Sequence, residues 1–367
     1  MIRRLIMVFN AVAWVLLVLA VAACYVSPAK CWWLALFGLG YWLWWLLVVA
    51  GTILLVLLRT KWVMVNVVLL LITWPFTQLV FGWPGKQMAS RSAPNSLSVL
   101  TYNVKNFDLY NWTGNRQTRQ HIFDVLQREQ PDIICFQEFY TDSLTYRNLS
   151  YVADSLHYPF HFFKPSYSYY YENSHHQDGQ TLSWGLAIFS RYPVVDSGVV
   201  SFEGTGSGQA IYADVLKGAE RLRIYNTHLH SIHLGYDDYD TLDELRETQN
   251  TQWFRVKNIL RKMRNAYRRR ALQAERLAKA IHEYSGKKLV CGDFNDPPTS
   301  YSAAQISASM NDMFKDLGTG FGNTYLNRFG FFRIDYVLYS NGITPLSYQI
   351  LPDACSDHYP VKAQLAW

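Results

Sequence analysis

The sequence is poor in cysteine and in charge, and these shortages exclude several kinds of protein. Its 367 residues include five cysteines and no CxxC pair, so no disulfide framework, zinc site or redox pair is indicated. Acidic residues are absent from Leu5 to Trp83, where a transport pathway or proton relay would need them. Internal repeats are absent too. The first part of the chain is therefore interpreted as an anchor, because it lacks the groups that transport requires.

The stretch from Leu5 to Trp83 is almost purely apolar, and its only charged residues are Lys30, Arg59 and Lys61. Roughly 20 apolar residues are needed to cross the hydrocarbon core of a bilayer. Three segments reach that length: Leu5 to Val26, Trp32 to Leu58, and Trp62 to Trp83. Tryptophans at their ends are typical of the headgroup region. The sequence thus predicts a membrane anchor with three transmembrane helices in residues 1–84.

Basic residues in the short loops predict the orientation of this anchor. With the N-terminus in the cytoplasm, the basic residues inside are Arg3, Arg4, Arg59 and Lys61, and those outside are Lys30, Lys86 and Arg91. Three crossings then place the rest of the chain on the extracytoplasmic side, the periplasm in a Gram-negative bacterium. The opposite topology stays open. So does a cleaved signal or lipoprotein site at Val21-Ala22-Ala23-Cys24, which two further spans would make redundant.

A polar linker, residues 85–96, joins the anchor to residues 97–367, which have ordinary globular composition. Apolar runs bounded by turn residues predict strands there. They are Ser98 to Tyr102, Ile133 to Gln137, Gly185 to Ser190, Ala210 to Leu216, Leu222 to His228, Lys288 to Gly292, Ile334 to Ser340 and Val361 to Ala366. Lys217 to Glu220 is interpreted as a hairpin turn, and Gln117 to Gln130 has a helical pattern. Strands with interspersed helices predict an α/β domain with a layered core.

A long helix is predicted from about Thr248 to Tyr284, because apolar residues recur there at three- and four-residue steps. Its other faces are basic from Arg261 to Arg270, and it begins inside an acidic-then-basic insertion, Gly235 to Arg264. The basic face is either solvated or in contact with anionic lipid or a polyanionic substrate. The aromatic stretch Tyr167 to Tyr171 is interpreted as a loop that packs on itself. A lip that stacks on bases or dips into the bilayer is the alternative.

Six short polar motifs lie at the ends of the predicted strands. They are Thr101-Tyr102-Asn103, Gln137-Glu138, Asn226-Thr227-His228-Leu229, Gly292-Asp293-Phe294-Asn295, Arg333-Ile334-Asp335-Tyr336 and Ser356-Asp357-His358-Tyr359-Pro360. One such motif alone would be an ordinary loop feature. The set together supplies what phosphoester hydrolysis requires: oxygen ligands for a hard divalent cation, a base for water, and donors to the charge on phosphate.

Oxygen ligands and amides come from three of these motifs. Glu138 can ligate the ion, and Asn103 and Asn295 can present amides to the ion or to phosphate. The combination predicts a metal and phosphate site where the strands end.

Proton transfer falls to the remaining acidic and imidazole groups. Asp293 can take a proton from water. His358 can donate to a phosphoryl oxygen while Asp335 fixes its tautomer, and His228 is a second candidate donor.

Together the motifs resemble the endonuclease/exonuclease/phosphatase superfamily, which includes deoxyribonuclease I, exonuclease III, neutral sphingomyelinases and inositol polyphosphate phosphatases. The resemblance covers Leu97 to Trp367 with the motifs in family order, and Gly185 to Pro193 looks like the family's central strand. It implies a four-layered α/β sandwich, two packed mixed sheets flanked by helices, after the three transmembrane helices. It also implies one Mg²⁺, or Mn²⁺ in its place, near Glu138, with Asn103 and Asp357 beside the metal.

The resemblance implies roles for the other residues as well. Asp293 would align or activate the water, and Asp335 would pair with His358. The amides of Asn103, Asn226 and Asn295 would bind the substrate. His228 matches the branch whose strand reads Asn-Thr-His-Leu, as in sphingomyelinase-like and deoxyribonuclease-like members.

The predicted function is a membrane-anchored, divalent-metal-dependent phosphoesterase acting on a lipid headgroup or a similar ester. A metal-dependent nuclease is the alternative, and a non-catalytic membrane interaction module is a second one. The predicted partners are the phosphate-ester substrate and the lipid bilayer, and no protein partner is predicted.

Overall fold

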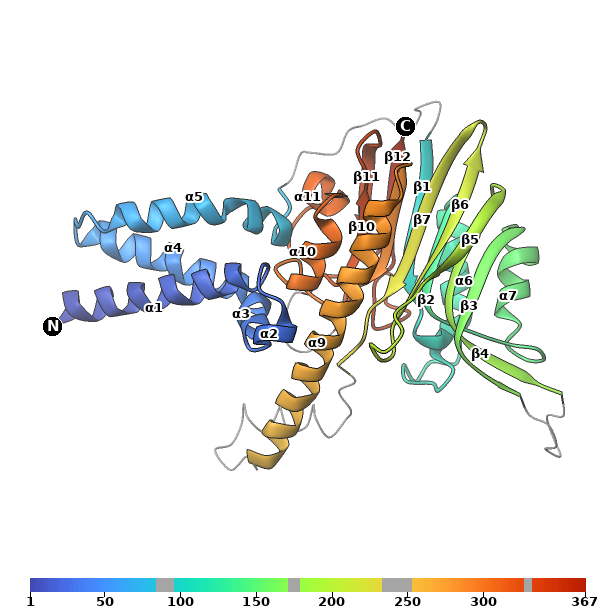
Figure 1. Ribbon diagram of the computed structural model, residues 1–367, viewed down its shortest axis with the longest axis horizontal. Coiled ribbons are helices and arrows are strands. Elements are labelled where there is room, and N and C mark those ends of the chain that lie inside the picture. Colours follow the sequence, from blue (N-terminus) through green and yellow to red (C-terminus); the bar gives the residue numbers. More distant parts are fainter. Residues whose placement is uncertain (84–95, 171–178, 233–252, 327–331) are drawn as a thin grey trace.

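The computed structural model describes the chain except for residues 84–95, 171–178, 233–252 and 327–331. Nearly all of the predicted linker therefore lies outside the described residues, as does most of the predicted insertion. Figure 1 shows two parts, a group of helices that projects to one side and a layered domain of strands and helices.

Two six-stranded sheets form the layered domain, in the orders β11-β12-β1-β2-β4-β3 and β5-β6-β7-β8-β10-β9. The first sheet contains β1 (Ser96–Asn103), β2 (Ile133–Asp142), β3 (Phe160–Tyr170), β4 (Thr181–Ser190), β11 (Thr344–Ile350) and β12 (Val361–Ala366). The second contains β5 (Val194–Val200), β6 (Gln209–Lys217), β7 (Glu220–His228), β8 (Lys288–Asp293), β9 (Asn311–Asp312) and β10 (Asp335–Tyr339). β1 is parallel to β2 and β7 to β8, whereas their outer neighbours are antiparallel, so both sheets are mixed.

Alternation along the strands divides the apolar side chains between two faces of each sheet. In β1, Leu97 and Val99 enter the core between the sheets, where Ile211 of the second sheet also lies. Leu100 and Tyr102 point the other way, into a core against helices. The alternation therefore makes β1 a central strand with both faces covered.

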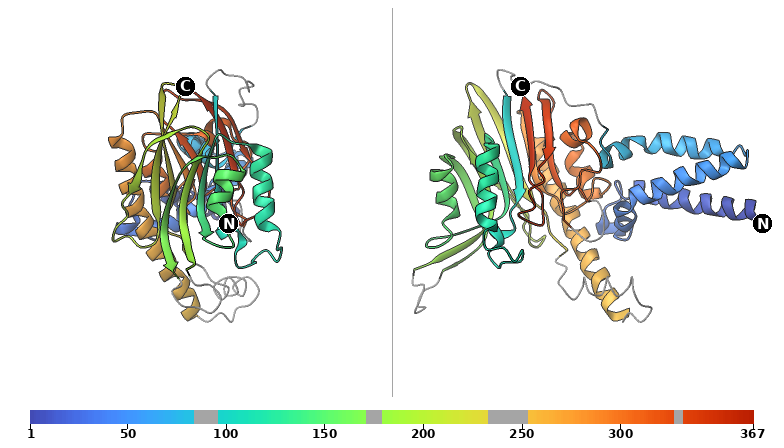
Figure 2. Two further views of the ribbon diagram at one scale, coloured as in Figure 1. Left: turned by 90° about the vertical axis from the view of Figure 1, so that its right-hand side faces the viewer. Right: turned by 180° about the vertical axis from the view of Figure 1, so that it is seen from behind.

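Helices cover the outer face of each sheet (Figures 1 and 2). On the first sheet lie η1 (Lys105–Asp108), α6 (Thr118–Glu129), α7 (Asn148–Ser150) and η2 (Tyr151–Ser155). On the second lie α9 (Trp253–Glu283) and α10 (Tyr301–Ser307), and α11 (Met313–Leu317) closes one end of the core between the sheets. The predicted four-layered α/β sandwich is confirmed.

The predicted strands are present with slightly different ends, but four strands were not predicted: β3, β5, β9 and β11. All four lie at the edge of a sheet. Tyr167 to Tyr170, predicted as a loop, belongs to β3, which pairs with β4 and leaves most of its side chains exposed. An edge strand with little buried surface lacks the apolar alternation that marks a strand in a sequence.

The N-terminal helices differ from the prediction in one respect. α1 (Ile2–Ala22) and α5 (Val63–Val80) are long and apolar enough to cross a membrane, at 21 and 18 residues. The second predicted span, Trp32 to Leu58, is not one helix, because the helix breaks at Gly40. The pieces are α3 (Leu34–Leu39) and the 17-residue apolar helix α4 (Tyr41–Leu57), and α2 (Pro28–Cys31) precedes them. The Phe37 carbonyl accepts from the Gly40 N–H at 3.1 Å and from Trp44 Nε1 of α4 at 3.0 Å, which ties the two pieces together at the break.

The helical group buries a few polar side chains among apolar ones such as Leu17 and Val48, and its outer surface is apolar. Asn10 of α1 and Asn66 of α5 are fully buried, and Asn66 Nδ2 donates to Asn10 Oδ1 at 2.9 Å and to Thr52 Oγ1 of α4 at 3.1 Å. Gly51 makes room for this contact, because a Cβ there would lie 2.3 Å from Asn10 Oδ1. The exposed apolar residues include Val8, Val15, Ile53, Leu71 and Ile72. The three long helices thus combine an apolar core with amide hydrogen bonds and present an apolar surface to their surroundings.

The helical group packs against the layered domain on the side of α9, α10 and α11 (Figure 1). Gly82 and Gly320 exchange two backbone hydrogen bonds, of 2.8 and 2.9 Å. Thr299 Oγ1 donates to the Gly38 carbonyl at 2.8 Å, and Arg333 Nη2 donates to the Leu79 carbonyl at 3.0 Å. The two parts are therefore joined by direct contacts and not by chain connectivity alone.

Candidate active site

The polar motifs meet at one edge of the two sheets. β1 and β2 end there in parallel, as do β7 and β8, and the carboxyl ends of parallel strands lie at the same edge. β10 is antiparallel to β8 and begins opposite its end, with Asp335 in register with Asp293. His228 is also in register with Asp293. Sheet topology thus brings together residues far apart in the sequence.

Asp293 lies at the centre of the group and is almost completely buried. Its Oδ2 accepts from Asn103 Nδ2 at 3.1 Å and lies 3.5 Å from His228 Nε2 and 3.7 Å from His358 Nε2. Its Oδ1 accepts from the Asn295 backbone N–H at 2.8 Å. Burial raises the pKa of Asp293 to about 6, an increase that His358 opposes and Asp335 reinforces.

Glu138 occupies an irregular position in β2. The pairing of β2 with β4 shifts register between Phe136 and Phe139, and Glu138 has a φ of 49°. A positive φ is costly for a residue with a Cβ, so this geometry is a local strain. The bulge turns the side chain into the cleft, where it is 33% exposed. Glu138 Oε1 lies 3.3 Å from Asn103 Nδ2 and 3.7 Å from His228 Nε2.

His358 and Asp335 form a buried pair in which Nδ1 and Oδ2 lie 2.9 Å apart. This contact directs Nε2 towards Asp293 and fixes the orientation of the ring. Burial by itself disfavours the charged imidazolium, but the carboxylates of Asp335 and Asp293 outweigh it and raise the pKa of His358 to about 10. At neutral pH His358 is therefore a cation that can donate a proton from Nε2.

The donor atoms fit a hard divalent cation between Glu138 and Asp293. Both carboxylates approach the same two donors, Asn103 Nδ2 and His228 Nε2, and adjacent negative groups favour a cation. Side-chain atoms of Asp293, Asp335 and His358 also lie within 4.8 Å of one another. That trio suits Mg²⁺ less well, because Asp335 Oδ2 is engaged by His358 and the third group is a nitrogen.

Three of the predicted site residues are placed differently from the expectation. Asn226 is fully buried between the sheets, where its amide donates to the carbonyls of Phe136 and Ala187 and accepts from Gln137. These hydrogen bonds tie the two sheets together, and a role of Asn226 in substrate binding stays a prediction. Asn103 turns its amide nitrogen to the two carboxylates while Oδ1 accepts from the Lys105 N–H, which suits phosphate binding better than metal binding.

Asp357, the third, is held away from the expected metal. Its Oδ2 forms a 2.6 Å ion pair with Lys105 Nζ, and its Oδ1 accepts from Ser356 Oγ at 3.2 Å. Lys105 was not predicted, although it follows Asn103 by two residues and that proximity was a usable signal. Asp357, predicted as a metal ligand, is therefore paired with a lysine of the site.

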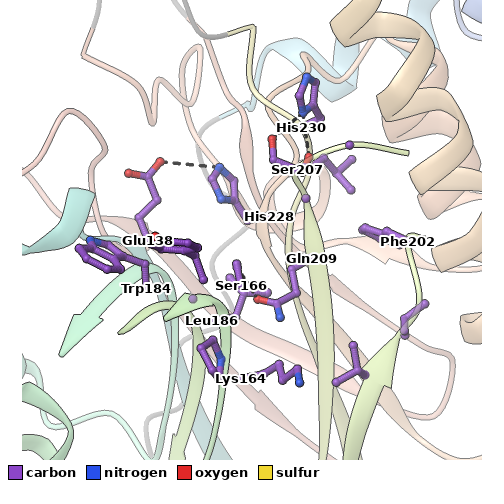
Figure 3. Close-up of a pocket in the computed structure, with 18 of the residues that line it drawn as sticks. Glu138, Lys164, Ser166, Trp184, Leu186, Phe202, Ser207, Gln209, His228 and His230 are labelled. Atoms are coloured by element: carbon purple, nitrogen blue, oxygen red, sulfur yellow. Dashed lines mark hydrogen bonds and ion pairs between the residues drawn. The ribbon is translucent and has the colours of Figure 1, made fainter. Parts of the chain in front are cut away.

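A cleft of about 1000 Å³ opens beside this group (Figure 3). Glu138 and His228 line its inner end, and Lys164, Trp184 and Phe202 lie along its walls. Further along, His230 Nδ1 contacts Ser207 Oγ at 2.8 Å. Tyr167 also lines the cleft, and it belongs to the aromatic stretch for which a lip was the alternative interpretation. Trp184 and Phe202 were not proposed from the sequence, because they lie on β4 and in the loop after β5 with no local motif.

A family model covers most of the layered domain. The model described as the endonuclease/exonuclease/phosphatase family matches residues 100–358, more than half of the chain. The chain belongs to the endonuclease/exonuclease/phosphatase family. Members of this family are hydrolases that act on phosphoester bonds. A second model, described as a domain of unknown function, matches residues 3–80, and no curated protein matches the chain.

Solved structures share the fold of this endonuclease/exonuclease/phosphatase domain. A family member from Bacteroides thetaiotaomicron is 16% identical with a TM-score of 0.52, over 75% of this chain and 99% of that one. The catalytic domain of human Nocturnin, solved with a bound sulfate anion, is 18% identical with a TM-score of 0.50, over 76% and 99%. A humanized D. rerio TDP2 with 14 mutations is 15% identical with a TM-score of 0.50, over 74% and 99%. At these identities the likeness shows the fold alone.

Proposed function

We propose that the chain is a membrane-anchored phosphoester hydrolase in which residues 97–367 are catalytic and residues 1–84 are the anchor. The observation that carries the catalytic part is the convergence of Glu138, Asn103, Asp293 and the Asp335–His358 pair at one buried edge. The apolar outer surface of α1, α4 and α5 supports the anchor, because such a surface is unfavourable in water and favourable in lipid. The orientation proposed from the loop charges places the catalytic part on the extracytoplasmic side.

Asp293 and His358 supply the two proton-transfer groups of the reaction. Water attacks phosphorus as the bond to the leaving oxygen breaks, and Asp293 accepts the proton of that water. The pKa of about 6 leaves Asp293 ionised at neutral pH, yet basic enough to accept a proton. His358 donates to a phosphoryl oxygen from Nε2, and Asp335 keeps the ring charged and oriented.

The amides and a metal ion would bind the phosphate. Asn295 is held at a φ of 52° with its Nδ2 on the Leu229 carbonyl, and Asn103 Nδ2 lies between the two carboxylates. Glu138, with Asp293 beside it, would hold Mg²⁺ or Mn²⁺. When bound, such an ion neutralises phosphate charge and lowers the pKa of a coordinated water.

The composition of the cleft favours a lipid headgroup or a similar small phosphoester over a polynucleotide. Among the described residues that line it, Lys164 is the only lysine or arginine, and Glu138 and Glu203 are acidic. A groove that follows a nucleic-acid backbone needs several cations. The aromatic and apolar walls at Trp184, Tyr167 and Phe202 suit a substrate with an apolar portion.

The full chain in lipid nanodiscs, assayed with Mg²⁺ and with EDTA, tests the proposal. Sphingomyelin, phosphoinositides, plasmid DNA and a chromogenic bis-phosphate ester are the substrates, and the expected result is Mg²⁺-dependent turnover with a lipid preferred. His358→Ala is expected to lose it. Asp196→Asn, a change at an exposed carboxylate distant from the site, is the matched control and retains it.

Other outcomes point to the alternatives. Preference for DNA with steep salt dependence would favour the nuclease. A folded chain without turnover and without Mg²⁺ binding would overturn the enzyme and favour a non-catalytic membrane module.

A further inference from the structure

α9 extends beyond the sheets that it covers, and its first turns are strongly basic. Residues 253–270 contain eight arginines and lysines and no acidic residue. In Figure 1 and in the right view of Figure 2, the N-terminal end of α9 reaches the same position as α2 and α3 along the direction of the anchor helices, and it projects to one side of them. Those short helices connect the domain-side ends of α1 and α4. The start of α9 is therefore placed where the headgroups of a bilayer around the anchor would be.

Four basic residues form a stripe on one face of this part of α9. Lys257, Arg261, Arg264 and Arg268 follow one another at steps of four, three and four residues, which places them on the same side of a helix. All four are exposed. Arg268 Nη2 donates to the carbonyl of Ala29 in α2 at 3.2 Å. The stripe is therefore turned towards the end of the anchor.

The charge of this stripe is not neutralised by the described part of the chain. Arg261 contacts the amide of Asn258, and no described carboxylate pairs with any of the four residues. Arg270, on the packed face of the same helix, is instead buried and pairs with Asp296 at 2.8 Å. The buried arginine of α9 is therefore paired within the chain, whereas the four exposed basic residues are placed to bind a partner.

Aromatic residues accompany the stripe. Trp253 and Phe254 begin α9 and are 77% and 71% exposed. Tyr25 and Trp33, which flank α2, are exposed as well. Tryptophan, tyrosine and basic side chains are the residues that helices at a bilayer interface present to the headgroup region.

We propose that the face of α9 formed by Trp253, Lys257, Arg261, Arg264 and Arg268 binds the anionic surface of the bilayer that holds the anchor. This inference rests on the membrane location proposed above. A polynucleotide would also be attracted by the charge, but the position level with α2 and the exposed aromatic rings favour lipid.

Binding of this face would also position the cleft. On the other side of α9, Gln273 Oε1 accepts from the His230 N–H at 2.8 Å, and Arg269 Nη1 lies 3.4 Å from His230 Nε2. His230 is part of the cleft wall. One helix therefore connects the proposed lipid contact with the site.

Hydrogen–deuterium exchange of the full chain tests the inference in nanodiscs of phosphatidylcholine, with or without phosphatidylglycerol. The amides of residues 253–264 are expected to exchange about tenfold more slowly in the anionic discs, and high salt should remove the difference. Arg261→Glu/Arg264→Glu should abolish it. Arg276→Glu/Lys279→Glu, the same charge change at exposed positions further along α9, should leave it intact. Arg261→Gln/Arg264→Gln repeats the test without new acidic groups.

The outcomes separate this inference from the anchor itself. If alkaline carbonate extracts the protein from the membrane, the proposed anchor is wrong. If the protein stays inserted but residues 253–264 exchange equally in both kinds of nanodisc, only the proposed lipid contact of α9 is wrong. Protection by an oligonucleotide and not by anionic discs would assign the stripe to a polyanionic substrate instead.

Discussion

The helical group and the sandwich both bury apolar residues, but they differ in their surfaces and in their buried polar groups. In the helices, Leu17 and Val48 are buried together with Asn10 and Asn66, whose amides bind each other, and the outer surface is apolar. In the sandwich, one cluster of buried polar groups lies at the edge where His228 Nε2 and Asp335 Oδ1 have no hydrogen-bond partner among the described residues. Buried amides that bind one another stabilise the packing of helices. Buried polar groups without a partner beside a cleft are typical of a catalytic or binding site.

The strongest test of this difference is Asp293→Asn. The exchange keeps the shape of the side chain and removes the base, so kcat is expected to fall by roughly a thousandfold, while the melting temperature stays the same or rises. Steady-state kinetics and thermal unfolding of the full chain measure both. Asp196→Asn controls for the loss of a carboxylate, and unchanged turnover in Asp293→Asn would assign the cluster to packing.

Arg333→Met tests whether the two parts are energetically joined. Arg333 and Asp312 are both buried and 2.7 Å apart, and Arg333 also binds the Leu79 carbonyl of α5. Removing one partner of a buried pair costs about 3–5 kcal/mol, measured by denaturant unfolding of the full chain in detergent. Arg128→Met, at an exposed pair with Asp353, is expected to cost less than about 1 kcal/mol. Equal costs would show that the contact with α5 adds nothing.

The pH dependence of kcat/KM sharpens the comparison, because the described anchor helices contain no acidic residue that could take part. The raised pKa of Asp293 means that the base is protonated below about pH 6, and the raised pKa of His358 means that the donor is lost above about pH 10. The profile should therefore fall on both sides, about tenfold per pH unit. Asp335→Asn removes charge that stabilises the imidazolium, so its upper limb should move to lower pH. If the alkaline side of the profile does not move in Asp335→Asn, His358 is not the proton donor that this side reports.

The smallest effect is expected from Asn66→Leu in the helical group. The exchange removes hydrogen bonds to Asn10 and Thr52, and such bonds between membrane helices contribute about 1 kcal/mol. Denaturant unfolding should show this loss while turnover is unchanged. Asn341→Leu, at an exposed turn of the sandwich, should stay within about 0.5 kcal/mol of the parent. A loss of turnover in Asn66→Leu would mean that the bundle acts on the site.

Much of the fold follows from local patterns. Central strands such as β1 and β8 have apolar side chains on covered faces, and their ends are marked by Asn103 and Asp293. Edge strands such as β3 lack that signal, since their side chains face solvent. The break at Gly40 was also missed, because composition measures apolar length and not helix continuity.

The candidate site shows the same division. Local motifs were enough to propose Asp293, Glu138, Asp335 and His358. Asn226 and Asp357 were indistinguishable from them by residue type. Only the tertiary structure shows that Asn226 is buried between the sheets and that Asp357 forms an ion pair with Lys105.

The sequence by itself determined the division into an apolar and a globular part, the family, and the residue types that can carry out phosphoester chemistry, since these depend on composition and motif order. The tertiary structure decided which of those residues face the cleft, how the anchor packs on Gly320 and Arg333, and which side of α9 is turned towards the anchor. These features depend on strand register and helix placement, which contacts between distant segments set.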